Sequence, residues 1–227
     1  MNEAYQSISA IAPIVVMSLF ALPAFIGVLK QRGFLLGTVI LLVLAGFTLA
    51  YETLALKTGL PQGTFSYADG LGPKLLETTP WTVIFVYPPI LLGAFWFASK
   101  FTKGFGRVIL AAIFATVISL VLDPAHVKLQ LWQWETAGPF YGVPIINYIG
   151  WFIKGFIGGW LLHLLWGKHH AVKASIAYSV LAVLLFWTGV NIGIDQWIPV
   201  GVGALASLVL LIVLILEKRQ LRRESHT

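Results

Sequence analysis

The sequence of 227 residues contains no cysteine and few charged residues, and both deficits narrow what the chain can be. Without cysteine, disulfide bonds and thiolate metal sites are excluded, and the redox compartment is left undetermined. Charged residues make up 11% of the chain. A soluble domain carries about 25%, so there is too little charge here to cover a water-facing surface. The composition therefore predicts an integral membrane protein.

Common enzyme motifs are missing as well. There is no phosphate-binding loop and no dinucleotide-binding glycine pattern. The histidines, His126, His163, His169, His170 and His226, do not have the spacing of metal ligands. We therefore expect neither a metal nor another cofactor. The net charge of +6 indicates basic loops beside a membrane rather than a nucleic-acid partner.

The sequence instead contains a series of long apolar stretches. A hydrocarbon core about 30 Å thick is crossed by roughly 20 apolar residues in a helix. Seven stretches meet this requirement: 8–29, 34–56, 81–99, 105–122, 145–166, 171–193 and 197–216. The pair Pro88-Pro89 is expected to kink the third. The sequence thus predicts an all-α fold, a polytopic membrane helical bundle in which residues 1–227 form one domain. The first stretch lacks the basic region of a cleaved signal peptide, so we expect it to be a retained span.

The charged residues separate by side when seven spans are assumed. One side holds Lys30, Arg32, Lys100, Lys103, Arg107, Lys168, Lys173, Lys218, Arg219, Arg222 and Arg223. The other holds Glu3, Glu52, Asp69, Glu77, Asp123, Glu135 and Asp195, with Lys57, Lys74 and Lys128. Short cytoplasmic loops are rich in Lys and Arg. We therefore predict a multi-pass protein of the cell membrane with its N-terminus outside and its C-terminus in the cytoplasm.

Two connections, about 57–80 and 123–144, differ from the rest. Both lie on the acidic side, and both are longer than a helical connection needs and dense in Gly, Pro, Tyr and Trp. Long connections of this kind are more often functional than simple linkers. We predict that the chemistry of the protein is gathered in these two polar loops.

Two acidic residues lie where apolar stretches meet these loops. Glu52 is near the end of the second stretch, where an ionised carboxylate is costly and a protonated one can act as a general acid. Alternatively, it contacts headgroups or pairs with Lys57 or Lys74. Asp123 ends the fourth stretch and shares a helical face with Ser119. It could simply terminate that helix, because the residue before a proline disfavours helix. Ionisable residues at membrane depth are expensive, which favours function.

Lys154 lies within the fifth stretch, on the same face as Asn147 and Trp151. A lysine at that depth requires a partner, and the carboxyls of Glu52 and Asp123 are the candidates. Equally, it could extend along the helix to reach an interface. The nearby Gly155 and Gly159 predict close helix packing. Four tryptophans are either interfacial anchors or the lining of an apolar pocket that stabilises a cation: Trp81, Trp132, Trp134 and Trp151.

Taken together, the two loops resemble those of the membrane carotenoid biosynthesis protein family that contains the carotenoid 1′,2′-hydratases. The first resembling run comprises Glu52, Thr58, Gly59, Pro61, Gly63, Tyr67, Leu71, Gly72, Pro73 and Lys74. The second comprises Asp123, Pro124, Trp132, Trp134, Gly138, Tyr141, Gly142, Val143, Pro144, Asn147, Gly150 and Trp151. The resemblance covers residues 51–151.

The resemblance implies hydration of the terminal C=C bond of an acyclic carotenoid, by protonation and capture of the cation by water, without a cofactor. It suggests Asp123 and Glu52 as the acid and base, in an order left open. The supporting residues would be Lys154, Tyr67, Asn147 and Lys74, and the substrate-binding residues Trp81, Trp132, Trp134, Tyr141 and Trp151. The polyene would enter from lipid, and the sequence does not indicate an oligomeric state. The alternatives are a carotenoid- or lipid-binding membrane protein without enzymatic activity and, ranked below it, a small proton-coupled transporter.

Overall fold

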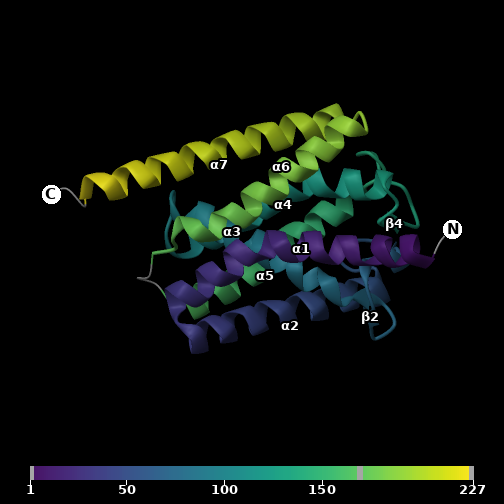
Figure 1. Cartoon of the computed structure of the whole chain (residues 1–227), viewed down its shortest axis with the longest axis horizontal. Coiled ribbons are helices and arrows are strands. Elements are labelled where there is room, and N and C mark those ends of the chain that lie inside the picture. The colour runs from purple at the N-terminus through teal and green to yellow at the C-terminus, as the bar shows by residue number, and fades with distance from the viewer. Residues whose placement is uncertain (1–2, 168–170, 225–227) are drawn as a thin grey trace.

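The structure, a computed structural model, describes residues 3–167 and 171–224 and is a bundle of long helices (Figure 1). The α-helices are α1 (Glu3–Arg32), α2 (Phe34–Thr58), α3 (Tyr87–Ser99), α4 (Gly104–Lys128), α5 (Ile145–Trp166), α6 (Ala177–Gly193) and α7 (Trp197–Glu224). In the described residues, seven helical segments are long and apolar enough to cross a membrane. The all-α fold and the predicted number of spans are therefore confirmed.

The third span differs from the kinked helix that we expected. It begins with a 3₁₀ segment, η2 (Trp81–Phe85), and the α-helix α3 starts only at Tyr87. Pro88-Pro89 therefore occupies the first positions of α3 rather than its interior. A proline is tolerated there because the first N–H groups of a helix have no intrahelical acceptor.

Helices α3 and α4 form the centre of the bundle. Every residue of α3 from Tyr87 to Ala98 is buried, and α4 packs against α3, α5, α6 and α7. Helices α2 and α7 lie at opposite edges (Figure 1). The predicted close packing at Gly155 and Gly159 is confirmed, because a Cβ at Gly155 would lie 2.9 Å from the Cα of Ala112. A small-residue face of this kind lets two helices approach closely.

Both helices that carry the acidic residues extend further than expected. Helix α2 continues to Thr58, and α4 continues through Pro124 to Lys128. Glu52 and Asp123 therefore lie inside helices, at least one turn before their ends. The interpretation that Asp123 merely terminates a helix is wrong, and the polar connections cover residues 59–80 and 129–144.

The two polar connections are joined by a short antiparallel strand pair. Strand β1 (Phe65–Tyr67) pairs with β4 (Trp132–Trp134), and Phe65 lies opposite Trp134. A second pair, β2 (Lys74–Leu75) with β3 (Thr79–Pro80), closes a small hairpin within the first connection. The connections lie at the same end of the bundle as the start of α1 (Figure 1). Segments more than 60 residues apart in the sequence thus form one cap over that end.

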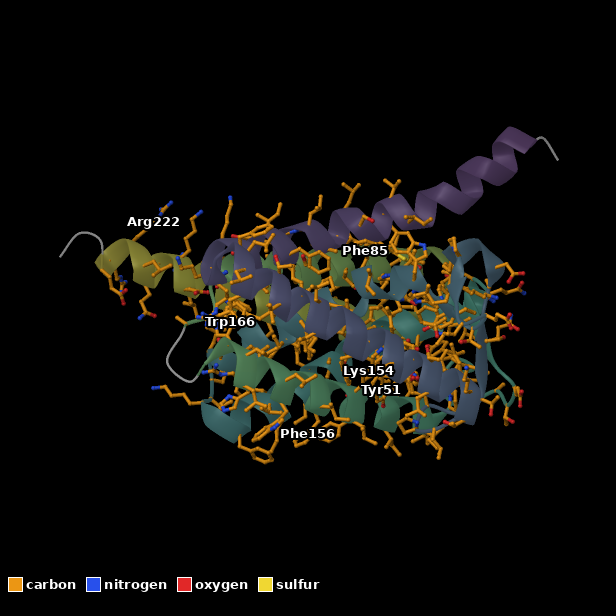
Figure 2. All side chains as sticks on the ribbon, turned by 90° about the horizontal axis from the view of Figure 1, so that it is seen from below. Tyr51, Phe85, Lys154, Phe156, Trp166 and Arg222 are labelled. Atoms are coloured by element: carbon orange, nitrogen blue, oxygen red, sulfur yellow. The ribbon has the colours of Figure 1, made fainter. Side chains whose placement is uncertain are left out.

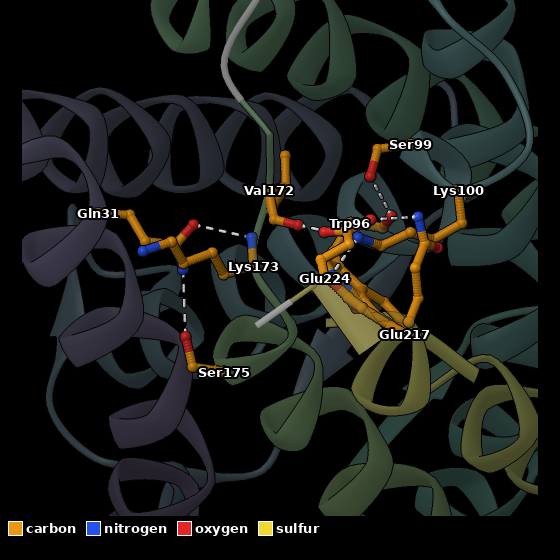
Figure 3. A network of polar contacts seen from close by, with 10 residues as sticks. Gln31, Trp96, Ser99, Lys100, Val172, Lys173, Ser175, Glu217 and Glu224 are labelled. Carbon is orange, nitrogen blue, oxygen red and sulfur yellow. Dashed lines mark hydrogen bonds and ion pairs between the residues drawn. The ribbon is translucent and has the colours of Figure 1, made fainter. Parts of the chain in front are cut away.

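The opposite end of the bundle is held together by a polar network (Figure 3). The Lys100 ammonium lies 2.7 Å from the Glu217 carboxylate, and the Trp96 indole donates to the same carboxylate at 3.2 Å. These contacts attach the second half of α7 to the end of α3. Arg107, in the first turn of α4, is buried, 5.1 Å above the ring of Phe95.

Candidate functional site

A pocket lies under the cap formed by the two polar connections. It encloses about 50 Å³, more space than one water molecule requires. Its lining residues are Met17, Glu52, Gln62, Phe65, Tyr67, Leu71, Pro80, Thr82, Val83, Val86, Tyr87, Asp123, Trp132, Trp134, Asn147, Trp151 and Lys154. Alternate residues of a strand face the same side. One face of the β1–β4 pair, with four aromatic residues, therefore forms a wall of the pocket, while Ser66 and Gln133 are exposed on the other.

The first acidic residue of the pocket, Glu52, is part of a buried ion pair. The Lys154 ammonium donates to Oε1 of Glu52, and the two side chains are only 2% and 6% exposed, respectively. Figure 2 shows Lys154 within the bundle. The predicted pairing of Lys154 with Glu52 is therefore confirmed. The alternative that Lys154 extends to an interface is wrong, as is pairing of Glu52 with Lys57 or Lys74.

Aromatic rings surround the ammonium group of Lys154. Its Nζ lies 3.8 Å from the ring centroid of Tyr87, 5.6 Å from that of Tyr51 and 5.7 Å from that of Trp151. The Tyr51 hydroxyl in turn donates to the backbone carbonyl of Gly150 at 2.8 Å. A cation near the face of an aromatic ring is attracted by the ring quadrupole. The rings thus offset part of the desolvation cost that burying a charge imposes.

Tyr67 of β1 completes the surroundings of Glu52. Its hydroxyl donates to Oε2 of Glu52 at 2.9 Å. Burial, followed by the charge of Glu52, raises the pKa of Tyr67 well above its usual value of 10.0. The phenol therefore keeps its proton and remains a hydrogen-bond donor. Both oxygens of Glu52 are thus held, one by a helix residue and one by the cap.

The second acidic residue, Asp123, has a different environment. It is 1% exposed, and its Oδ2 accepts a hydrogen bond of 2.5 Å from the side-chain amide of Asn147. Asn147 lies in the first turn of α5, which Pro144 precedes. The pocket therefore contains one carboxyl paired with a cation and one hydrogen-bonded to a neutral amide. Two carboxyls in such different environments can divide the roles of acid and base between them.

The other residues predicted for the site divide into two groups. Trp132, Trp134 and Trp151 line the pocket with the acidic residues, whereas Trp81, Tyr141 and Lys74 do not. Trp81 packs edge-on against Phe85, the hydroxyl of Tyr141 accepts a hydrogen bond from the backbone of Ile198 at 3.4 Å, and the ammonium of Lys74 lies 2.6 Å from the exposed carboxylate of Asp69. The family resemblance suggested these three residues, and the folding of the loops places their side chains outside the pocket.

Sequence reasoning missed several of the residues that line the pocket. Tyr87, Gln62, Phe65 and Met17 all line it. Tyr87 directly precedes the proline pair in the third span. The only feature of the sequence that could have pointed to it is an aromatic residue with a polar hydroxyl at the start of a helix. Met17 is indistinguishable from an ordinary lipid-facing residue in the sequence.

The histidines show why no metal-ligand pattern appeared. His126 is buried between Trp132 and Trp187, with ring centroids at 3.7 and 3.9 Å. Its Nδ1 lies 2.6 Å from the carbonyl oxygen of Leu122. These contacts give the imidazole a packing role between two tryptophan rings. Among the described residues, no group of three or more potential ligands is close enough to hold a metal. His169, His170 and His226 lie outside the described residues.

Known proteins match the chain over most of its length. The relatives include bisanhydrobacterioruberin hydratase of Haloarcula japonica, which is 28% identical over 181 residues. That alignment covers 75% of this chain and 61% of the relative, which is therefore considerably longer. No solved structure matches the chain significantly. The family described as carotenoid biosynthesis protein matches residues 5–210, well beyond the two polar loops. With its predicted resemblance confirmed in this way, the chain belongs to the carotenoid biosynthesis protein family.

Proposed function

We propose that the protein hydrates the terminal C=C bond of an acyclic carotenoid without a cofactor. The observation that carries this proposal is the pair of buried carboxyls, Glu52 and Asp123, which line one pocket but have partners of different charge. Hydration of an isolated alkene needs a dry acid, a base for water and walls that tolerate a cation. The family and the named activity of the relative support the same reaction.

In this mechanism Asp123 is the acid. Its carboxyl is hydrogen-bonded to the neutral amide of Asn147 and forms no ion pair with the described residues, and burial without an ion pair favours a carboxyl that carries its proton. The order of the two acidic residues, open from the sequence, is assigned on this difference. Asp123 transfers its proton to the less substituted carbon of the terminal double bond, and the more substituted carbon becomes a tertiary cation.

Glu52 is the base. Its ion pair with Lys154 keeps it as a carboxylate, able to accept a proton from water as the water oxygen bonds to the cationic carbon. The product is a tertiary alcohol, and a proton must then return from Glu52 to Asp123 through water before the next turnover. General acid–base catalysis of this kind contributes about 10²–10⁴-fold to a rate.

The aromatic wall stabilises the cation between these two steps. Trp132, Trp134 and Phe65 present their rings to the pocket without the ammonium contact that Tyr87 already has. The polyene enters from lipid past Met17 of α1, which lines the pocket together with Val83 and Val86. Only the reacting end needs to reach the acidic residues, so the rest of the polyene stays in apolar surroundings.

We place this pocket on the outer side of the cell membrane. Most of the described basic residues lie toward the other end of the bundle, where Arg222 is found (Figure 2), and basic residues mark cytoplasmic ends. Reporter domains fused to each terminus should be accessible from outside only at the N-terminus. The reverse pattern would put the pocket on the cytoplasmic side and leave the chemistry unchanged.

The direct test is co-expression in a host that accumulates an acyclic carotenoid such as lycopene, followed by mass analysis of the pigments. The wild type should give a product heavier by one water, about 18 Da, and Asp123→Asn should lower its yield at least about 100-fold. Asp69→Asn is the matched control, because it makes the same change at an exposed acidic residue outside the pocket. It should behave as the wild type does.

The other outcomes discriminate between functions. Unchanged pigment that co-purifies with the wild type would favour a carotenoid-binding protein over an enzyme. Full turnover by folded Asp123→Asn and Glu52→Gln variants would contradict the assigned acid and base, whatever the product.

A further inference from the structure

Two polar side chains of the pocket, Gln62 and Tyr87, have no role in the mechanism so far. Oε1 of Gln62 and the hydroxyl of Tyr87 are buried and have no hydrogen-bond partner among the residues that the structure describes. The two residues are 3% and 2% exposed, and both line the pocket. A buried polar atom without a partner carries the full cost of its desolvation, so two of them in one small pocket require an explanation.

Both side chains are held in place by their surroundings. The backbone carbonyl of Gln62 accepts a hydrogen bond of 2.9 Å from the indole of Trp134. Gly150 of α5 packs so closely on this segment that a Cβ there would come within 3.1 Å of the Pro61 carbonyl oxygen. The ring of Tyr87 contacts both the ammonium of Lys154 and the ring of Trp151, 3.8 and 5.4 Å away. These contacts keep both residues from moving toward another hydrogen-bond partner.

The substrate cannot supply the missing partners. A polyene end is a hydrocarbon, which neither donates nor accepts a conventional hydrogen bond. The amide oxygen of Gln62 needs a donor, and the hydroxyl of Tyr87 can donate to an oxygen. A water molecule can donate to an amide oxygen and accept from a hydroxyl.

We propose that Gln62 and Tyr87 hold the water that attacks the carbocation, an assignment that rests on the proposed hydration. The water donates one O–H to Oε1 of Gln62 and accepts a hydrogen bond from Tyr87. Its second hydrogen faces Glu52, which takes that proton, and its second lone pair forms the new C–O bond. The alcohol product then keeps its oxygen between the same two groups.

This assignment predicts a change in the fate of the cation. A tertiary cation that water does not capture loses a proton from a neighbouring carbon and returns to an alkene. In D₂O, where Asp123 carries deuterium, protonation followed by such a loss leaves deuterium on carbon in the recovered polyene. The amount of deuterium in the alkene therefore measures protonation separately from capture by water.

The experiment uses purified full-length protein, unlabelled lycopene and D₂O buffer, with mass analysis of both alkene and alcohol. Tyr87→Phe and Gln62→Met should each slow alcohol formation about tenfold, the effect of one lost hydrogen bond. At the same time, the deuterium in recovered alkene should rise relative to alcohol. Tyr148→Phe is the matched control, because its hydroxyl is also buried without a partner among the described residues but Tyr148 does not line the pocket. It should leave both products unchanged.

Three results would overturn the proposal. If both variants formed the alcohol at the wild-type rate, the two groups would not hold the water. Loss of alcohol and of deuterated alkene together would indicate a structural or protonation defect instead. If the wild type itself formed neither product, the proposed hydration would fail, and the role of Gln62 and Tyr87 would fail with it.

Discussion

The two ends of the bundle each contain a Lys–Glu ion pair next to aromatic rings, but the pairs differ in depth. At the capped end, the side chains of Lys154 and Glu52 are 2% and 6% exposed. At the opposite end, those of Lys100 and Glu217 are 22% and 17% exposed (Figure 3). The same chemical pair thus lies in a closed pocket in one region and at a partly open helix junction in the other.

This difference shows what each pair contributes. A buried pair is rarely worth its desolvation cost for stability alone, since apolar residues of similar volume often do as well. The Lys154–Glu52 pair therefore indicates chemistry, because its carboxylate faces the pocket. The Lys100–Glu217 pair also bonds to Trp96 and to the backbone of Val172. It connects three segments of the chain and faces no catalytic group.

The largest expected effect comes from breaking only the buried pair. Lys154→Met should destabilise the protein by about 3–5 kcal/mol, because Glu52 would be left as an uncompensated buried charge. Unfolding in detergent, followed by circular dichroism, measures this loss. The double variant Lys154→Met with Glu52→Gln should recover most of the stability but none of the hydration activity. A single variant as stable as the wild type would show that the pair is not structurally coupled.

Changing the acidic residue of each pair to an amide separates chemistry from packing. Glu52→Gln should lower hydration at least about 100-fold, the contribution of a general base. Glu217→Gln, the same substitution at the other end, should leave turnover within about twofold, because the effect of a partly exposed pair is less than about 1 kcal/mol. Turnover per folded protein is the measurement. Equal losses in the two variants would contradict the distinction between the ends.

A smaller effect is expected at the cap. Tyr67→Phe removes the hydroxyl that donates to Glu52 and should slow hydration about fivefold to tenfold, in line with one hydrogen bond to a charged group. Tyr141→Phe serves as the control, because Tyr141 belongs to the cap but does not line the pocket. Its turnover should match the wild type. A larger effect in Tyr141→Phe than in Tyr67→Phe would argue against the contact with Glu52.

The smallest effect is expected at the open end. Lys100→Met should cost less than about 1 kcal/mol of stability and leave hydration unchanged. The loss should appear as faster hydrogen exchange in the second half of α7, which this pair attaches to α3. Exchange in α2, at the far edge of the bundle, provides an internal reference. Uniformly faster exchange would mean that the pair stabilises the whole fold.

Some features of the site could be predicted because they follow from local chemistry. The apolar stretches required helices that span a membrane, since lipid offers no partners for the backbone. An ionisable residue at that depth requires a partner, which made Glu52 and Asp123 the candidates for Lys154. The close packing at Gly155 was predictable from the spacing of small residues alone.

Other features depended on contacts between distant segments. The pairing of β1 with β4 brings Tyr67 to Glu52 and turns two separate loops into one cap. A three-residue strand is too short for its alternating pattern to be recognised in a sequence. The end of α4 was misplaced for a related reason, because the local preference of Asp123 before proline was overridden by packing on its neighbours.

The sequence by itself thus determined the membrane bundle and the acidic residues and limited the candidate partners of Lys154 to Glu52 and Asp123, because hydrophobicity and burial of charge act residue by residue. Only the tertiary structure decided which loop residues face the pocket. It brings in Gln62 and Tyr87 and turns Trp81, Tyr141 and Lys74 away. The physical reason is that the direction of a loop side chain is set by backbone pairing with a distant segment. No local sequence pattern predicts that pairing.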